Sequence, residues 1–226
     1  MLRRLIFPLL LGLVGAGVLV GLGVWQLQRL QWKNAALAQI DARIGEAPVA
    51  LAAEVEPESD KYLAVQVTGR LTGTEALVLT SLKDAGPGYR VIAGFELAED
   101  KRKIMLDLGF MAENNREFTR PTGQFAVVGN LHWPEETDNF TPEPDLLIGI
   151  WFARDVDRMA NVLGTEQVLV VARSLDPAIA AIAPLPVDTA SIANDHLNYA
   201  ITWFSLAFVW LGMTALLVWR IRRRTE

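Results

Sequence analysis

Two long apolar stretches lie at opposite ends of the chain, and shorter runs of alternating apolar and polar residues fill the region between them. Residues 5–24 (LIFPLLLGLVGAGVLVGLGV) carry no charge, and residues 200–219 are almost wholly apolar. Each stretch has about 20 residues, the length that an α-helix needs to cross the hydrocarbon core of a bilayer. The pattern predicts transmembrane helices at 5–24 and 200–219, and therefore a lipid bilayer around both.

The region that follows the first apolar stretch predicts a helix that continues beyond the membrane. Residues 25–45 have helix-forming side chains, and neither glycine nor proline occurs before Gly45. Two prolines then indicate a linker over residues 46–59. Residues 46–199, the linker included, are predicted to form a β-rich domain outside the membrane.

Within this domain, apolar alternation and turn residues predict short strands. These strands cover residues 62–68, 76–80, 89–97, 103–108, 124–132, 146–152 and 167–173. Residues 155–163 predict one short helix, with Asp155 as its N-cap and Gly164 at its end. Short strands at regular spacing favour antiparallel pairing. The predicted fold class is α+β, with two transmembrane helices flanking an antiparallel β-sheet or small β-barrel that carries a short helix.

Charge is distributed unevenly between the tails and the domain. The two tails, residues 1–4 and 220–226, hold six arginines and one glutamate, whereas the rest of the chain has 15 basic and 25 acidic residues. By the positive-inside rule, both tails are predicted to be cytoplasmic, with the domain on the other side of the membrane. The acidic domain argues against nucleic acid as a partner, because it would repel phosphate groups.

The first apolar stretch resembles a signal peptide only in part. Arg3 and Arg4 precede it, but it is longer than an apolar signal region of about 7–15 residues and has no A-x-A cleavage site. We therefore expect it to remain as an anchor. The absence of a presequence rich in Arg and Ser favours a bacterial protein in the inner (plasma) membrane, with a periplasmic domain.

Residues that enzymes commonly use are scarce. The chain has no cysteine and two histidines, and it lacks a P-loop, a dinucleotide fingerprint, a G-x-S-x-G elbow and an H-E-x-x-H motif. We therefore expect no enzymatic activity. His132 is predicted to be a surface residue. His196 lies one turn before the second span, where an imidazole can bind a metal or a haem iron, or remain a solvated interfacial residue.

One face of the first helix carries candidate binding residues just outside the membrane. At 100° per residue, a sector of about 120° holds Trp25, Gln26, Arg29, Trp32 and Lys33. This face suits a planar amphipathic ligand, because indole rings can stack on it while Arg29 and Lys33 pair with carboxylates such as haem propionates. The alternative is an aromatic belt with snorkelling cations.

The second helix has a matching face. A sector of about 100° holds His196, Tyr199, Ala200, Trp203, Ala207 and Trp210. The two tryptophans provide flat apolar walls, and the two alanines leave room beside them. The alternative is a face packed on lipid or protein, with an interfacial histidine. Gly17 and Gly21 are predicted to let the two helices approach closely.

Three segments form a recognisable combination. They are residues 23–33 (GVWQLQRLQWK), 62–69 (YLAVQVTG) and 194–204 (NDHLNYAITWF). Together they resemble the LGxWQLxRLxWK, Y-x-x-V-x-V-x-G and NNHLxYAxTWF blocks of the surfeit locus protein 1 family, over essentially the whole chain. The sequence departs from that pattern at residues 107–112 (DLGFMA), where the family has N-R-G-W-V-P, and at Asp195, where it has a second Asn.

The resemblance implies a Shy1-like assembly factor for cytochrome c oxidase, active in respiratory-chain biogenesis. Such a protein would receive haem a transiently from haem A synthase and assist its insertion into oxidase subunit I. In that picture His196 binds the haem iron, and the remaining cofactor contacts come from Trp203, Tyr199, Trp25, Arg29, Trp32 and Lys33. The alternative is a ligand-free membrane chaperone that stabilises assembly intermediates of subunit I.

Overall fold

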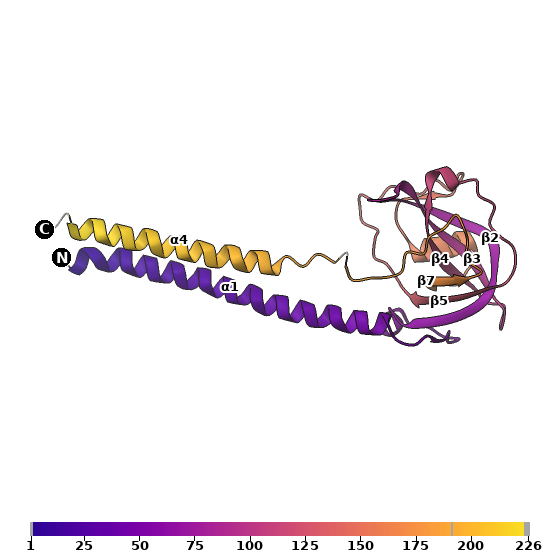
Figure 1. Cartoon of the computed structure of the whole chain (residues 1–226), viewed down its shortest axis with the longest axis horizontal. Coiled ribbons are helices and arrows are strands. Elements are labelled where there is room, and N and C mark those ends of the chain that lie inside the picture. Colours follow the sequence, from indigo (N-terminus) through magenta and orange to yellow (C-terminus); the bar gives the residue numbers. More distant parts are fainter. Residues whose placement is uncertain (1, 191, 224–226) are drawn as a thin grey trace. The chain divides into compact units, whose positions relative to one another are not determined.

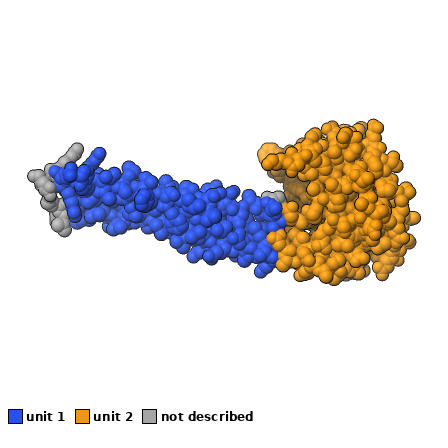
Figure 2. All heavy atoms as spheres, viewed as in Figure 1, with its two compact units in different colours: residues 1–39, 189–226 blue, residues 40–188 orange. Residues whose placement is uncertain are grey.

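The computed structural model describes residues 2–190 and 192–223, with side chains from residue 5 onward. Met1, Ser191 and residues 224–226 lie outside the described residues, so parts of both predicted tails (1–4 and 220–226) fall there. The chain forms two compact units (Figure 2), Met1–Gln39 with Thr189–Glu226 and Ile40–Asp188. The first unit is helical, and the second is built on a β-sheet.

Two long helices make up the first unit (Figure 1). α1 spans Leu2–Ile44, its last residues belonging to the second unit, and α4 spans His196–Arg223. α1 runs without interruption through the predicted span and its predicted extension. Both helices contain windows long and apolar enough to cross a membrane, of which only 11% and 6% is buried. Their apolar side chains therefore face outward, unlike those of a core helix in a globular domain, and they need apolar surroundings.

α1 and α4 lie side by side and run in opposite directions (Figure 1). A Cβ atom added at Gly15 would lie 2.5 Å from Nε1 of Trp210, and one added at Gly23 would lie 2.7 Å from the ring of Phe204. Glycine is needed at both positions because large rings of α4 occupy the space that a side chain would fill.

The prediction that Gly17 and Gly21 let the helices approach is wrong. No atom lies within 4 Å of a Cβ built at either glycine. The buried positions of α1 recur at intervals of three, four or seven residues, and they are Gly12, Ala16, Gly23 and Gln26. The two predicted glycines lie outside this phase, so they face away from α4.

Seven strands form the sheet of the second unit. They are β1 (Val49–Ala50), β2 (Ala64–Leu82), β3 (Gly86–Leu97), β4 (Lys103–Ala112), β5 (Phe125–Leu131), β6 (Ile150–Trp151) and β7 (Leu169–Asp176). β2, β3, β4, β7 and β5 pair in that order, and β5 pairs again with β2. These five strands close on themselves, which agrees with the predicted small barrel. β1 and β6 add to β2 outside the ring.

The predicted antiparallel arrangement is wrong for three of the strand pairs. β1–β2, β2–β6 and β4–β7 run parallel, so the sheet is mixed. Parallel neighbours need a connection of about a dozen residues or more. The chain has such a connection between β4 and β7, where residues 113–168 include β5, β6 and the short helix α3 (Val156–Leu163). This detour allows β7 to run in the same direction as β4.

β2 joins two of the predicted strands, 62–68 and 76–80. Its pairing with β3 shifts between Leu71 and Glu75, so the strand bends at a bulge instead of ending. Gly69 marks a close approach, because a Cβ there would lie 2.2 Å from the carbonyl oxygen of Glu96.

Two other predicted elements differ in the structure. Most of the predicted strand 146–152 is a turn, and the predicted linker 46–59 contains β1 and part of α2 (Pro57–Asp60). The 3-10 helix η1 (Glu113–Asn115) follows β4.

Apolar side chains are buried on both faces of the central strands. One face points into the barrel, with Val67, Val91, Phe95, Leu106, Val127 and Val170 in its core. The other face, which includes Ile92, Met105 and Leu169, is covered by α3 and β6. α3 has the predicted ends: the Asp155 side chain accepts a hydrogen bond from the Arg158 backbone N–H at 3.0 Å, and Gly164 has a φ of 67°. Burial on both faces explains the nearly continuous apolar runs of β3, β4 and β7.

Candidate functional site

His196 is the first residue of α4, and its side chain pairs with a glutamine of α1. Its Nδ1 lies 2.7 Å from Oε1 of Gln26, whose residue is only 9% exposed. Gln26 lies in the same helical phase as the buried Gly12, Ala16 and Gly23. A buried polar side chain needs a hydrogen-bond partner, and here α4 provides it, because the surrounding contacts are apolar.

Two further hydrogen bonds join α1 to the segment that precedes α4. Nζ of Lys33 donates to the carbonyl oxygen of Ala193, and Nδ2 of Asn194 donates to Oδ1 of Asn34 at 2.8 Å. We call this set, together with Gln26–His196, the polar junction. It fixes the start of α4 against α1 with side chains that reach residues about 160 positions away in sequence.

The hydrogen bond from His196 determines which ring nitrogen is available for chemistry. A glutamine Oε1 can only accept a hydrogen bond, so Nδ1 of His196 carries the proton. In that tautomer the lone pair is on Nε2. A histidine that binds a metal through one nitrogen usually donates its other N–H to an acceptor of this kind, which orients the ring and raises its basicity. The junction therefore prepares His196 to act as a ligand through Nε2.

The structure divides the other predicted site residues into two groups. Lys33 belongs to the polar junction, and Trp203 is partly buried on the same face of α4 as His196. Four residues are exposed: Trp25 at 49%, Trp32 at 64%, Tyr199 at 57%, and Arg29, whose guanidinium lies 5.0 Å from the ring centre of Trp32. The structure thus places His196 and Lys33 in the polar junction, and the ligand contacts of the exposed residues stay a prediction.

Trp210, predicted to provide a flat wall, is instead used to join the helices. Its Nε1 donates to the carbonyl oxygen of Gly12 at 3.0 Å, and its ring covers Gly15. Sequence reasoning placed Gln26 on the correct sector but gave it no role, and it assigned none to Asn34. The signal for Gln26 was its heptad-like spacing from the small residues that face α4.

A single imidazole suits haem better than a bare metal ion. Among residues 2–190 and 192–223, no group of three or more His, Cys, Asp or Glu side chains is placed to hold a metal. Haem brings its own porphyrin ligands for the iron, so one histidine of the protein could hold it. His196 fits that role through Nε2, and the exposed apolar surfaces of α1 and α4 suit a largely apolar ring.

The barrel contains a second polar cluster, which is ionic. The fully buried carboxylate of Asp107 accepts hydrogen bonds from Nε of Arg90, from Arg154 at 3.3 Å and from the Gly109 backbone N–H at 3.1 Å. Arg154 also donates from Nε to Glu136 at 3.1 Å. Burial raises the pKa of the Asp107 carboxyl, although both guanidinium groups oppose that change. For Glu136 burial acts in the same direction, but the hydrogen bonds and charge of Arg154 outweigh it and lower the pKa.

His132 lies beside this ionic cluster, and its prediction as a surface residue is wrong. Its ring stacks on Tyr62 with the centroids 5.5 Å apart. Its Nδ1 is buried and has no hydrogen-bond partner among the described residues. Burial, followed by the positive charges of Arg154 and Lys61, lowers the pKa of His132 to about 4. His132 is therefore neutral at physiological pH, and its proximity to two cations makes it a poor site for a further positive charge.

Comparison with known proteins places the chain in a family. A family model described as the SURF1 family matches residues 13–208. A SURF1-like protein of Drosophila melanogaster is 30% identical over 218 residues, which cover 84% of this chain and 72% of the relative. A SURF1-like protein of Rickettsia felis is 30% identical over 199 residues (84% and 87%), and surfeit locus protein 1 of Rattus norvegicus is 27% identical over 210 residues (82% and 67%). On this basis, and as its three sequence blocks predict, the chain belongs to the SURF1 family.

Proposed function

We propose that this chain is a membrane-inserted assembly factor for cytochrome c oxidase, which binds haem a through His196 and assists its insertion into oxidase subunit I. Membership of the SURF1 family supports the assembly role. The observation that carries the haem proposal is the 2.7 Å hydrogen bond between His196 Nδ1 and Gln26 Oε1. That bond leaves the lone pair of Nε2 available at the first residue of α4.

The same proposal includes a location. α1 and α4 cross a bacterial inner membrane, both termini are cytoplasmic, and the barrel is periplasmic. The outward-facing apolar side chains and the six arginines of the two tails support this topology. The polar junction would then lie at the outer surface of the membrane, where haem A synthase and subunit I could exchange a ligand with it.

The chain's own contribution is binding and orientation, without an enzymatic step. When bound, haem a supplies the redox-active iron that the oxidase needs. Gln26 orients the His196 ring and holds the proton on Nδ1, and the exposed helix surfaces accept an apolar macrocycle. A single histidine ligand would hold haem less tightly than a permanent site with two protein ligands, which would suit transfer to a partner.

A ligand-free chaperone is the second candidate. The observation in its favour is that Gln26, Lys33 and Asn34 are all used to hold α4 and the segment before it against α1. Under this alternative the polar junction is purely structural, and the protein stabilises subunit I through its helices and barrel.

An absorbance spectrum distinguishes the two candidates. The protein is co-expressed with the haem a biosynthetic enzymes, purified in detergent, and compared with the His196→Ala and His132→Gln variants. Haem binding predicts a Soret band that falls by about tenfold in His196→Ala and persists in His132→Gln, since only one histidine is an axial ligand. A colourless wild-type protein that still co-purifies with subunit I would support the chaperone instead.

A further inference from the structure

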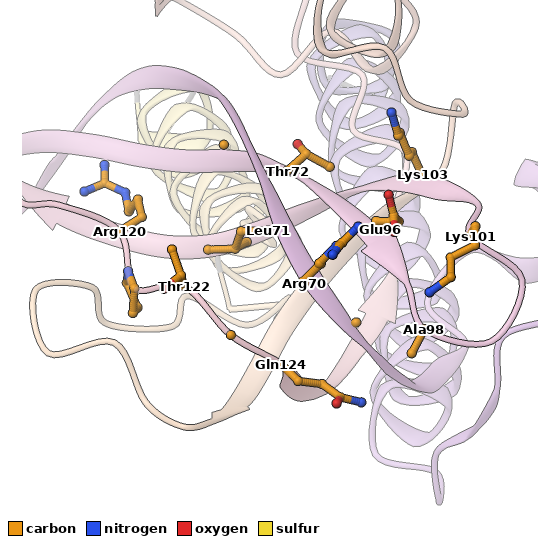
Figure 3. Close-up of a pocket in the computed structure, with 14 residues that line it drawn as sticks. Arg70, Leu71, Thr72, Glu96, Ala98, Lys101, Lys103, Arg120, Thr122 and Gln124 are labelled. Atoms are coloured by element: carbon orange, nitrogen blue, oxygen red, sulfur yellow. Dashed lines mark hydrogen bonds and ion pairs between the residues drawn. The ribbon is translucent and has the colours of Figure 1, made fainter.

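Four basic residues line a groove on the barrel that is separate from the ionic cluster, since no residue of that cluster lines it. The groove has a volume of about 740 Å³, and Arg70, Lys101, Lys103 and Arg120 line it (Figure 3). Its walls come from the bulged part of β2, the end of β3, the turn between β3 and β4, and the segment just before β5. It lies entirely within the second unit.

The groove carries positive charge that the protein does not neutralise. Arg70 pairs with Glu96 at 2.9 Å, and Arg120 pairs with Glu75 at 2.9 Å. Lys101 and Lys103 are exposed, and neither side chain has a partner among the described residues. Outside the two tails the chain has ten more acidic than basic residues, so a positive groove here contrasts with its surroundings.

The backbone of Lys101 adds an independent observation. Its φ is 63°, in the left-handed region that glycine and asparagine favour. A lysine at this position has no conformational advantage within the turn. Residues held in sparsely populated backbone conformations cluster at binding sites, so the conformation of Lys101 at the edge of the groove favours a binding role.

The arrangement of the cations indicates the shape of the ligand. In Figure 3, Arg120 and Lys101 lie at opposite ends of the groove, with Arg70 between them. A small anion would need donors that converge on one point, whereas these are spread along a line. Thr72, Thr122 and Gln124 also line the groove and can hydrogen-bond to a peptide backbone.

The charge of the whole domain restricts the class of partner. A long polyanion or an anionic bilayer would have to approach the acidic surface around the groove as well as the groove itself. A short extended segment places its carboxylates only where the cations are. We propose that the groove binds an acidic peptide segment of a partner protein, with carboxylates paired to Lys101 and Lys103. This proposal does not depend on haem binding.

Fluorescence anisotropy on the full-length protein in a nonionic detergent tests the proposal. The probe is a fluorescein-labelled octapeptide of alternating Glu and Val. We expect saturable binding at low salt that weakens about tenfold when Lys101→Glu and Lys103→Glu are combined, and also at about 0.3 M salt. The matched control combines Lys61→Glu and Lys83→Glu, which changes the charge equally outside the groove and should alter affinity by less than about twofold.

Three results would overturn the proposal. Equal weakening in both double variants would mean general attraction to the domain, and undiminished binding of the same peptide with Gln in place of Glu would exclude carboxylate recognition. Binding of inorganic phosphate or phosphatidylglycerol vesicles, lost in the Lys101/Lys103 variant, would assign the groove to a phosphate group. Circular dichroism checks that both double variants are folded; if the groove variant is not, Lys101→Gln alone should still weaken binding.

Discussion

The two units bury polar groups in different ways. In the barrel, the Asp107 carboxylate is held by two guanidinium groups and a backbone N–H, and Arg154 bridges it to Glu136. In the helical unit, the centre of the polar junction is an amide–imidazole pair, in which Nδ1 of His196 is hydrogen-bonded to Gln26. The ionic cluster is complete within the barrel, whereas the junction leaves one ligand atom available.

This difference indicates that the ionic cluster stabilises the fold, whereas the polar junction can take part in ligand binding. A buried ionic network stabilises the fold only when all its charges are paired, so its polar groups are used within the network and do not bind a ligand. A neutral pair costs less to bury, and it can therefore leave a lone pair unused. We expect changes in the barrel cluster to alter folding, and changes at the junction to alter ligand binding.

The largest effect is expected for Asp107→Ala. Removal of the carboxylate leaves the Arg90 and Arg154 guanidinium groups beside an empty, buried space, which should lower the free energy of unfolding by about 3–5 kcal/mol. Chemical denaturation of the full-length protein in detergent, followed by near-ultraviolet circular dichroism, measures the loss. Arg158→Met is the control, because its pair with Glu143 is solvent-exposed and should contribute little. Similar losses in both variants would contradict the role assigned to burial.

A smaller loss is expected for Gly15→Leu in α1. The new side chain would collide with the Trp210 ring, which lies 2.5 Å from the Cβ position, and overpacking of this kind costs about 1–3 kcal/mol. An SDS titration of the purified protein in nonionic micelles measures the stability of the helix pair. Gly17→Leu places the same side chain in open space and should leave the midpoint unchanged. A lower midpoint for Gly17→Leu would mean that Gly17 faces α4, as the sequence pattern predicts.

Much of the architecture could be predicted because it depends on local pattern. The spans follow from uninterrupted apolar runs, and α3 follows from Asp155 and Gly164, which satisfy its end groups. Strand pairing could not be predicted, since the parallel β4–β7 pair depends on a connection of 56 residues, 113–168, whose path is a tertiary property. Likewise, a glycine is expected both where a strand ends and where the backbone of a neighbouring strand approaches closely. The sequence therefore does not show which of the two applies to Gly69.

The candidate site was predictable in part for the same reason. A helical wheel places Gln26, Trp25 and Trp32 in one sector, but the sector is wide, and only its edge faces α4. Which edge does so depends on the side chains of both helices, here the small residues of α1 and the rings of Phe204 and Trp210. The low pKa of His132 was not predicted, because it comes from partial burial and the charge of Arg154, 22 residues along the chain, and no local pattern reveals either.

At the polar junction, Gln26→Leu should reduce haem affinity by about tenfold without unfolding the protein, since second-shell partners of metal-binding histidines have effects of this size. The variant removes the acceptor of the Nδ1 proton and keeps a similar volume. Haem titration by Soret absorbance measures the affinity, and nitrogen NMR of the His196 ring measures the tautomer ratio independently. Gln28→Leu, on the exposed side of α1, is the control. An unchanged tautomer ratio in Gln26→Leu would show that Gln26 does not position the ring.

The smallest expected effect is a pH dependence that arises from His132. Its pKa is about 4 in the folded protein and 6.5 at its ordinary value, so the unfolded chain binds the proton first as the pH falls. The stabilisation that neutral His132 provides is therefore complete above pH 6.5 and is lost progressively toward pH 4. Because the side chain is partly exposed, we expect this loss to be about 1–2 kcal/mol, less than the full shift implies.

His132→Phe isolates this contribution, because it keeps an aromatic ring against Tyr62 and removes the titrating group. The charged groups that act on His132, namely Arg154, Lys61, Glu136 and Arg90, stay the same in both proteins. The difference between their unfolding free energies, measured by denaturation at several pH values, should change between pH 6.5 and 4 and remain flat above that range. A difference that grew only below pH 4 would place the titration on Glu136, whose lowered pKa makes its stabilisation disappear at more acidic pH.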